Sequence, residues 1–376
     1  MVEAFTELHA PVADWLNLSL ALRAGEYSTV GNTFTYRFGA DAPVTDDIKL
    51  RASYSSSVRA PNINDLYSTG ATSTAPNNVD PCNGVTAAST GNIATNCRSI
   101  AAINQRIAAK GAYTLVASEA NNTRLLQTGT LSLKEETADS VTLGAVYTLN
   151  DNWSFSADYY GIEIEDGITR VGPDVFVKRC YDVASSNFDA TCGGNLLRDS
   201  NDGPILNLRS TLINASKIET SGIDIEVSYL YENIKLNLIA NSLSQFDITD
   251  ANGVVEEFVG RPLYPKMRLT LNGSYDLTEQ LNIFSQVRFR NKTKSFLGKT
   301  NLSDDLNTMD AATYVDLRLN YQLIKDLSLY VGLNNLFDVQ PDINARADSF
   351  SVGTNTEARA YDVIGRQYFA GMKYRF

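Results

Sequence analysis

Four cysteines are the residues of this chain whose types and spacing suggest the most specific chemistry. Cys82 and Cys97 lie in one long segment between predicted strands, and Cys180 and Cys192 lie in another. Four thiolates can bind a Zn²⁺ ion, but CxxC spacing is missing and the two pairs belong to different segments, which disfavours a metal site. Three pairings are possible, and pairing within each segment is favoured. The sequence therefore predicts the disulfides Cys82–Cys97 and Cys180–Cys192, in an oxidising compartment.

Catalytic chemistry has little support in the sequence. His9 is the only histidine, so a Ser-His-Asp or Cys-His mechanism would have to use it. It precedes Pro11 on a predicted strand, with no nucleophile in a recognisable context. The adjacent carboxylates Glu135–Glu136 and Asp304–Asp305 fall at turns or loops, where solvated charge is the usual state. We expect a protein that is not an enzyme and that needs no cofactor or metal.

A group of charged residues forms a candidate ligand site. Arg288 and Arg290 occupy alternate positions of one predicted strand, and Asp316 and Arg318 do so on the next. Alternate side chains share one face of a sheet, so these residues are expected to line one surface. Guanidinium groups suit a negatively charged ligand. The alternative is that Arg–Asp pairs on neighbouring strands only stabilise that surface.

The elements that must position these residues are β-strands. Apolar and polar residues alternate in Leu16–Arg23, Ile223–Tyr229 and Leu327–Asn334. This alternation is typical of a strand with one polar and one apolar side. We count about thirteen such strands. They start near Glu3, Leu16, Thr33, Ile48, Asp139, Asn152, Arg209, Ile234, Lys266, Leu281, Ala311, Leu327 and Gly365.

Strand length and loop length both favour a transmembrane barrel. Many strands run to about ten residues, as a membrane-spanning strand requires. Tight turns such as Asn150–Asp151 and Glu232–Asn233 alternate with long connections such as 58–138 and 165–208. Short turns on one side and long loops on the other are typical of outer-membrane barrels. A soluble β-sandwich or β-solenoid is the alternative, but its interior would not hold so many charged residues opposite leucine.

Charge and hydropathy exclude several other classes. The net charge is −11 and the pI is about 4.7, which argues against nucleic-acid binding and against a polybasic membrane-surface protein. No run of apolar residues is long enough for a transmembrane helix. The N-terminal MVEAFTELHAP lacks the basic and apolar regions of a signal peptide. The bilayer is then expected to be crossed by a closed β-barrel.

Four segments resemble the TonB-dependent outer-membrane receptors. RASYSSSVRAPNINDLY (Arg51–Tyr67) is similar to a strand that runs into an "R-A-P" loop in that family. NASKIETSGIDIEVSY (Asn214–Tyr229) resembles a long strand of these receptors. LYVGLNNLFDVQP (Leu329–Pro341) resembles the penultimate strand with its "N-L-F-D" signature, and GRQYFAGMKYRF resembles the final strand. The four segments occur in the family's order and cover essentially the whole chain.

The resemblance implies an all-β fold, an antiparallel transmembrane barrel of 22 strands filled by an N-terminal plug. About thirteen strands, counted back from the end, correspond to the C-terminal part of such a barrel. We therefore expect residues 1–376 to be a receptor fragment without the plug, the TonB box and the first strands. Thirteen strands are not expected to close a bacterial barrel alone.

The resemblance also implies function and partners. It indicates active import of a scarce nutrient across the Gram-negative outer membrane, with siderophore, cobalamin and oligosaccharide as candidate ligands. Arg288, Arg290, Asp316 and Arg318 would face this ligand from the barrel wall. The expected partners are outer-membrane lipid, the nutrient, TonB through the plug, and the barrel-assembly machinery. Phe376 resembles the terminal signal read by that machinery; alternatively it is an interfacial girdle aromatic.

Two other functions remain compatible with a barrel of this kind. One is a passive porin without a plug, and the other is an adhesin whose long loops bind partners. A barrel hydrolase is disfavoured because the chain has a single histidine. Upstream sequence encoding a plug and a TonB box would distinguish active import from a porin.

Overall fold

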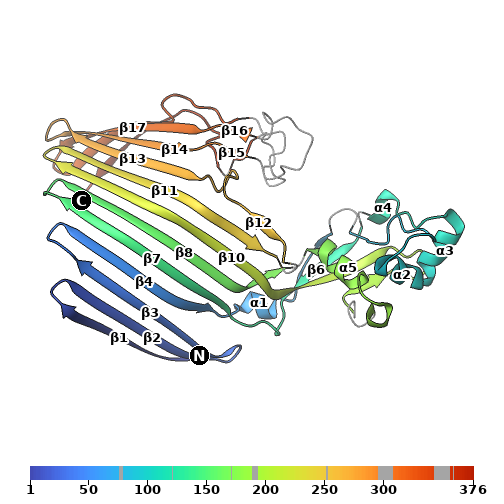
Figure 1. The fold of residues 1–376 in the computed structure, drawn as a ribbon. Helices are drawn as coiled ribbons and strands as arrows, with labels where there is room; N and C mark the ends of the chain where they lie inside the picture. Colours follow the sequence, from blue (N-terminus) through green and yellow to red (C-terminus); the bar gives the residue numbers. More distant parts are fainter. Residues whose placement is uncertain are drawn as a thin grey trace.

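The architecture is that of a curved antiparallel sheet, seen in a computed structural model. The structure describes residues 1–376 except 76–78, 121, 171, 189–193, 251–252, 295–307, 343–355 and 359. Each strand of the sheet pairs with the next long strand in the chain, as Figure 1 shows. The long strands are β1 (Val2–Ala13), β2 (Leu16–Tyr27), β3 (Gly31–Pro43), β4 (Ile48–Arg59), β7 (Glu136–Leu149), β8 (Trp153–Arg170), β10 (Ile205–Tyr231), β11 (Ile234–Thr249), β13 (Met267–Asp276), β14 (Leu281–Arg290), β17 (Ala312–Ile324), β18 (Leu327–Asn334) and β19 (Gln367–Tyr374).

These thirteen strands confirm the predicted fold class and most of the predicted strand starts. Consecutive long strands are antiparallel, and the tight turns gather at one end of the sheet while the long loops gather at the other (Figure 1). At the two ends of the sheet, β1 pairs with β2 and β19 pairs with β18, so the described strands form an open sheet. No helix of the described part of the chain is long and apolar enough to cross a membrane.

The register separates an apolar face from a polar one. Leu8, Leu20, Phe38, Tyr54 and Val141 lie opposite one another in a single row across five strands. Four of them are exposed, Phe38 by 51% and Val141 by 37%. Large apolar side chains left exposed in a regular row indicate a surface that faces lipid.

The opposite, lumen face carries hydrogen bonds and ion pairs between strands. Arg51 Nε donates to Asp158 Oδ1 at 2.7 Å, across the β7 backbone at Gly144. Asn320 donates to Asn282, which in turn donates to Ser274 at 2.8 Å. Polar groups that pair with each other in this way suit a wet interior rather than a packed apolar core.

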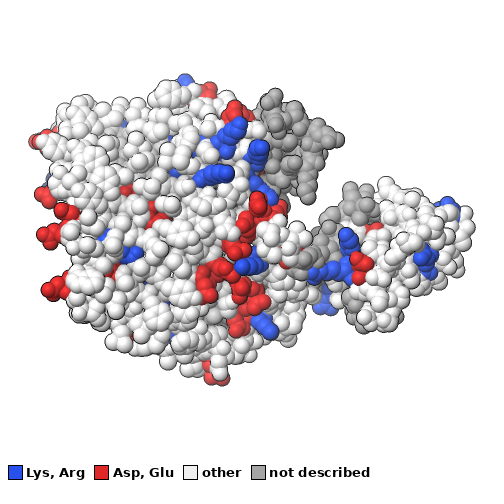
Figure 2. Space-filling model, viewed as in Figure 1, with Lys and Arg blue, Asp and Glu red and all other residues white. Residues whose placement is uncertain are grey.

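A row of carboxylates marks where the strands leave the bilayer. Asp139, Glu163, Glu219, Asp247 and Glu257 lie opposite one another on β7, β8, β10, β11 and the short β12 (Val255–Glu257). They share the outward face with Val141, and Figure 2 shows acidic side chains crossing that face near the loop-side ends of the strands. Charged groups on the lipid side are tolerated only near the interface. The row therefore sets the outer limit of the membrane-spanning region.

The two longest connections contain short helices. The first of them has α2 (Asn92–Ser99) and α3 (Ala101–Lys110). Gly111 ends α3 in the left-handed conformation at φ 80°, which glycine adopts without strain. The remaining short elements are α1 (Ile63–Tyr67), α4 (Ala117–Ala120), α5 (Pro173–Tyr181), a 3₁₀ turn (Ser185–Asn187), β5 (Ala71–Thr74), β6 (Arg124–Thr128), β9 (Leu196–Arg198), β15 (Thr293–Lys294) and β16 (Thr308–Met309).

Candidate functional site

The predicted charged residues lie at the loop-side ends of β14 and β17. A pocket of about 280 Å³ opens there, and Arg268, Arg288, Arg290 and Tyr314 contribute to its lining. Alternation along β13 and β14 turns the arginines to the lumen face. The loop residues Pro262, Leu263 and Ala360 also line the pocket. We call this site the arginine pocket.

Arg290 is held deep in the arginine pocket. Its side chain donates to the carbonyl oxygens of Pro262 and Ala360, and it stacks on Tyr361 with 4.2 Å between guanidinium carbon and ring centre. Arg290 is only 9% exposed, yet its Nε has no hydrogen-bond partner among the described residues. A buried donor without an acceptor is costly, which marks this position as able to receive an anionic group.

Arg268 adds a second cation to the arginine pocket, where the charge of the buried Glu357 also acts on Arg290. It stands directly opposite Arg290 in the register of β13 and β14, and it donates to the carbonyl oxygen of Leu263. Neither arginine forms an ion pair within the described part of the chain. Like charges directly opposite each other on adjacent strands destabilise the sheet. An anion bound between the two arginines would offset this repulsion.

Arg288 and Asp316 form the cross-strand pair that the sequence suggested. Arg288 Nη2 lies 3.0 Å from Asp316 Oδ2, and its guanidinium covers the Tyr314 ring at 5.3 Å. The second oxygen of Asp316 accepts the backbone N–H of Asn335 at 2.8 Å. Both oxygens are therefore occupied, so the ion pair fixes one wall of the arginine pocket.

Arg318 lies apart from the other three candidates. Its guanidinium covers the ring of Tyr330 on β18 at 4.5 Å. The structure thus brings together Arg288, Arg290 and Asp316 and leaves Arg318 deeper on the wall. The sequence did not predict Arg268 as a site residue. Alternation along the strand places it on the polar face, but only the register of β13 and β14 shows that it lies opposite Arg290.

A cluster of aromatic rings includes Tyr264, the residue that follows the pocket-lining Leu263 in sequence. The rings of Phe246 and Tyr264 are 4.7 Å apart, and Phe258 lies 5.4 Å from Phe246. Arg261 covers Phe258 at 4.3 Å. Arg261 also forms an ion pair with Glu256 at 2.7 Å. Because Arg261 and Tyr264 flank the pocket-lining Pro262 and Leu263 in sequence, the aromatic cluster is anchored to the same loop as the pocket, and aromatic faces suit a ligand with flat, polarisable groups.

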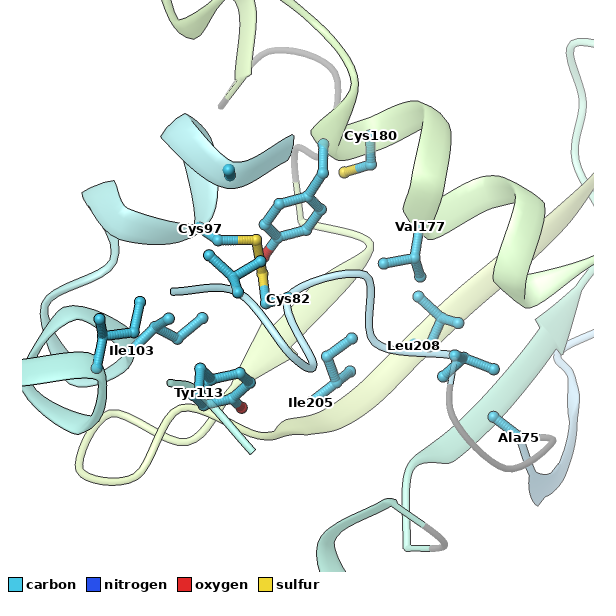
Figure 3. Packing of buried hydrophobic residues seen from close by; sticks show 14 of the residues in the cluster. Ala75, Cys82, Cys97, Ile103, Tyr113, Val177, Cys180, Ile205 and Leu208 are labelled. Atoms are coloured by element: carbon cyan, nitrogen blue, oxygen red, sulfur yellow. A yellow bond between two sulfur atoms is a disulfide. The ribbon is translucent and has the colours of Figure 1, made fainter. Parts of the chain in front are cut away.

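The two longest loops fold together into a unit that we call the loop module, the described residues of 60–135 and 172–208. Its buried cluster includes Cys82, Ile103 and Tyr113 from the first loop and Val177 and Leu208 from the second, and Figure 3 shows them packed side by side. This cluster is larger than either other buried apolar cluster of the described chain. Strand β6 of the first loop also pairs in parallel with the outer end of β10.

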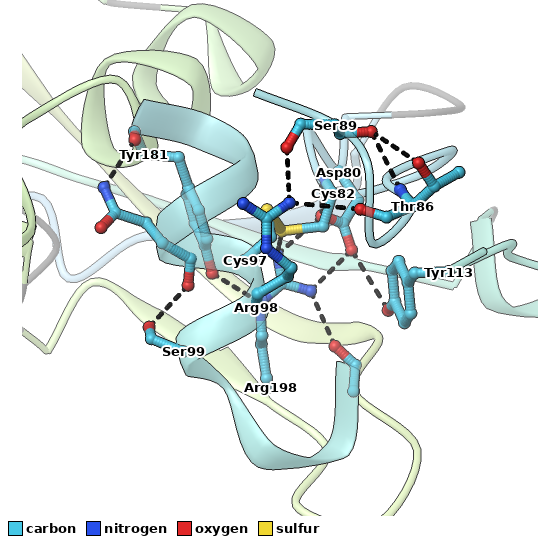
Figure 4. Close-up of a disulfide and its surroundings, with 12 residues drawn as sticks. Asp80, Cys82, Thr86, Ser89, Cys97, Arg98, Ser99, Tyr113, Tyr181 and Arg198 are labelled. Atoms are coloured by element: carbon cyan, nitrogen blue, oxygen red, sulfur yellow. Dashed lines mark hydrogen bonds and ion pairs between the residues drawn. A yellow bond between two sulfur atoms is a disulfide. The ribbon is translucent and has the colours of Figure 1, made fainter. Parts of the chain in front are cut away.

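A buried ion pair joins the two loops inside the module. Arg198 donates to both carboxylate oxygens of Asp80 at 2.6 Å, and its Nε donates to the Tyr181 hydroxyl at 2.6 Å (Figure 4). The two side chains are 7% and 3% exposed. Burial works to lower the pKa of Arg198, but the bidentate bond to Asp80 outweighs it and raises that pKa.

One of the two predicted disulfides, Cys82–Cys97, is confirmed in the described residues. Cys82 and Cys97 form a disulfide with a Cα–Cα distance of 5.6 Å, next to the Arg198–Asp80 pair (Figure 4). Cys180 is disulfide-bonded, and its predicted partner Cys192 lies outside the described residues. The described residues contain no group of three or more side chains that could hold a metal ion.

The chain end is placed at the tight-turn end of the sheet (Figure 1). Strand β19 ends at Tyr374, and the fully exposed Phe376 packs edge-on against the Tyr374 ring at 5.1 Å. This position suits both sequence-based interpretations of Phe376, so its role in assembly stays a prediction.

Comparison with protein families gives a single assignment. Residues 2–336 match the family model described as TonB dependent receptor-like, beta-barrel. The chain belongs to the TonB-dependent receptor family. Barrels of this family lie in the outer membrane of Gram-negative bacteria, and so does this receptor chain. Comparison with curated proteins finds no match.

Solved structures share the fold of this receptor chain. A variant of the ferric enterobactin receptor PfeA from Pseudomonas aeruginosa, in complex with enterobactin, is 16% identical with a TM-score of 0.67. The siderophore receptor PirA from Acinetobacter baumannii is 17% identical with a TM-score of 0.65. Each match covers 100% of this chain and 45% of the other. The ferripyoverdine receptor of P. aeruginosa is 15% identical with a TM-score of 0.54, over 100% and 38%. The chain thus spans less than half the length of these receptors.

Proposed function

We propose that this chain forms the C-terminal part of the barrel domain of a TonB-dependent receptor that imports an anionic ferric siderophore. Residues 1–376 would supply barrel wall, arginine pocket and loop module. TonB would act through a plug domain contributed by further sequence, and the barrel-assembly machinery would insert the whole receptor.

One observation carries the choice of ligand class. Arg268 and Arg290 lie opposite each other on the adjacent strands β13 and β14 without an ion-pair partner in the described chain, and Tyr264 follows the pocket residue Leu263 in sequence. Ferric siderophores with catecholate groups combine negative charge with flat, polarisable rings, which matches both features. Neutral oligosaccharides would bring no negative charge to these two arginines. The structural neighbours named for enterobactin, siderophores and ferripyoverdine are consistent with this choice.

Uptake by cells that produce the complete receptor tests the proposal. We expect accumulation of ⁵⁵Fe from ferric enterobactin or ferripyoverdine, and loss of that accumulation when tonB is deleted or a protonophore is added. Cyanocobalamin and maltooligosaccharides serve as matched ligands of other classes. TonB-independent uptake would indicate a passive channel, and uptake of only the neutral ligands would contradict the assignment of the arginine pocket.

A further inference from the structure

The last hairpin carries two glycines that are covered by aromatic rings of the opposite strand. Gly332 of β18 faces Phe369 of β19, and Tyr330 of β18 faces Gly371 of β19. A Cβ on either glycine would overlap the ring opposite it. The two rings are 6.2 Å apart. Each strand therefore has one ring that covers a glycine of the other strand and one glycine that is covered in return.

Other glycines on the lumen face show a weaker form of this arrangement. Gly222 of β10 is covered by Tyr160 of β8, whose hydroxyl would lie 2.6 Å from an added Cβ. That pair has no counterpart in the reverse direction. Within the described strands, the hairpin of β18 and β19 has the reciprocal form. On the neighbouring strand β17, Arg318 stacks on the Tyr330 ring at 4.5 Å.

The lipid face of this hairpin cannot specify its own register. Leucine and valine occupy every outward position of β18, and tyrosine, alanine and methionine occupy those of β19. Because side chains alternate with a period of two, a slip of two residues keeps an apolar face toward lipid. Burial of apolar surface is then nearly the same in the native and slipped pairings.

The lumen face distinguishes the pairings sharply. A slip of two residues in one direction places Tyr330 opposite Phe369, so two rings compete for one site. The slip in the other direction places Gly332 opposite Gly371 and leaves both rings without a partner surface. We propose that the Gly332–Phe369 and Tyr330–Gly371 pairs are a register lock, which fixes the pairing of the final strand when the barrel forms.

Cysteine cross-linking in the complete receptor reads the register directly. Val331→Cys with Ala370→Cys reports the native pairing, and Leu329→Cys or Leu333→Cys with Ala370→Cys reports each slip. These positions face lipid and leave the lock untouched. In the otherwise native receptor we expect only the native cross-link. Combining Tyr330→Ala and Phe369→Ala should raise a slipped cross-link to about a tenth of the total or more.

Two further variants make the test decisive. Tyr368→Ala removes a ring from the lipid face of the same strand and should leave only the native cross-link. Reversing both pairs, with Tyr330→Gly, Gly332→Phe, Phe369→Gly and Gly371→Tyr, again gives each strand one ring opposite a glycine. This variant should show native cross-linking and heat-modifiable mobility even if ring removal prevents folding. Native cross-linking at full yield after removal of both rings would overturn the lock, as would slipped cross-linking or misfolding of the fully reversed receptor.

Discussion

Replacing Arg198 by methionine tests whether the two long loops are one cooperative unit. The substitution removes all bonds to Asp80 and to the Tyr181 hydroxyl. It leaves Asp80 with a side chain only 3% exposed and without its cation. Breaking a buried ion pair in this way costs about 3–5 kcal/mol. That cost corresponds to opening of the loop module that is about 10²- to 10⁴-fold more frequent.

Hydrogen exchange by mass spectrometry measures this opening segment by segment. We expect faster exchange in α2 and α3 of the first loop and in α5 of the second, by the same factor, with β13 and β14 unchanged. The matched variant combines Arg198→Met with Asp80→Leu. Replacement of both charges by apolar groups of similar volume is often nearly neutral, so most of the protection should return.

The pattern of exchange decides between one module and two independent loops. Faster exchange confined to the second loop, which contains Arg198, would refute the co-folded module. Equal destabilisation by the single and double variants would show that the unpaired Asp80 carboxylate is not the source of the cost.

Three further predictions concern the loop module and the chain end. Replacing Cys82 and Cys97 by serine should lower module stability by about 3 kcal/mol, the value for a closed loop of this size, with intact barrel strands in hydrogen exchange. Burial raises the pKa of Tyr113 and of Tyr181, so both stabilise the module below their unfolded pKa near 10 and lose this contribution as pH rises above it. Thermal scans between pH 8 and 12 should show the loss, and Tyr113→Phe should reduce it. Deleting Phe376 from the complete receptor should lower its outer-membrane level in membrane fractions, whereas a normal level would assign Phe376 to the interface alone.

The barrel strands were predictable because lipid and water impose a period of two on the sequence. Leu327–Asn334 shows this pattern without help from any distant contact, and tight turns such as Glu232–Asn233 were visible between alternating runs. The loop module was much less predictable. Its helices are short, and their stability depends on packing across two loops that are distant in sequence.

The arginine pocket shows the same limit at the level of single residues. Face assignment from alternation placed Arg288, Arg290 and Asp316 correctly on one surface of neighbouring strands. It could not show that Arg290 is buried under loop carbonyls, or that Arg268 is its direct neighbour, because both depend on register and on loop positions. The sequence alone predicts which face of a strand a side chain occupies, whereas the residue opposite it depends on the tertiary structure.

Ligand binding by cells that produce the complete receptor tests the central claim most directly. Titration with ⁵⁵Fe-labelled ferric enterobactin and ferripyoverdine at low temperature measures affinity without transport. We expect Arg268→Gln to weaken binding by about tenfold or more, since one charge-assisted contact is lost. Arg124→Gln, which removes an exposed loop cation on β6 outside the arginine pocket, should leave affinity unchanged. Equal affinity of the Arg268 variant and the native receptor for every siderophore that binds would contradict the account.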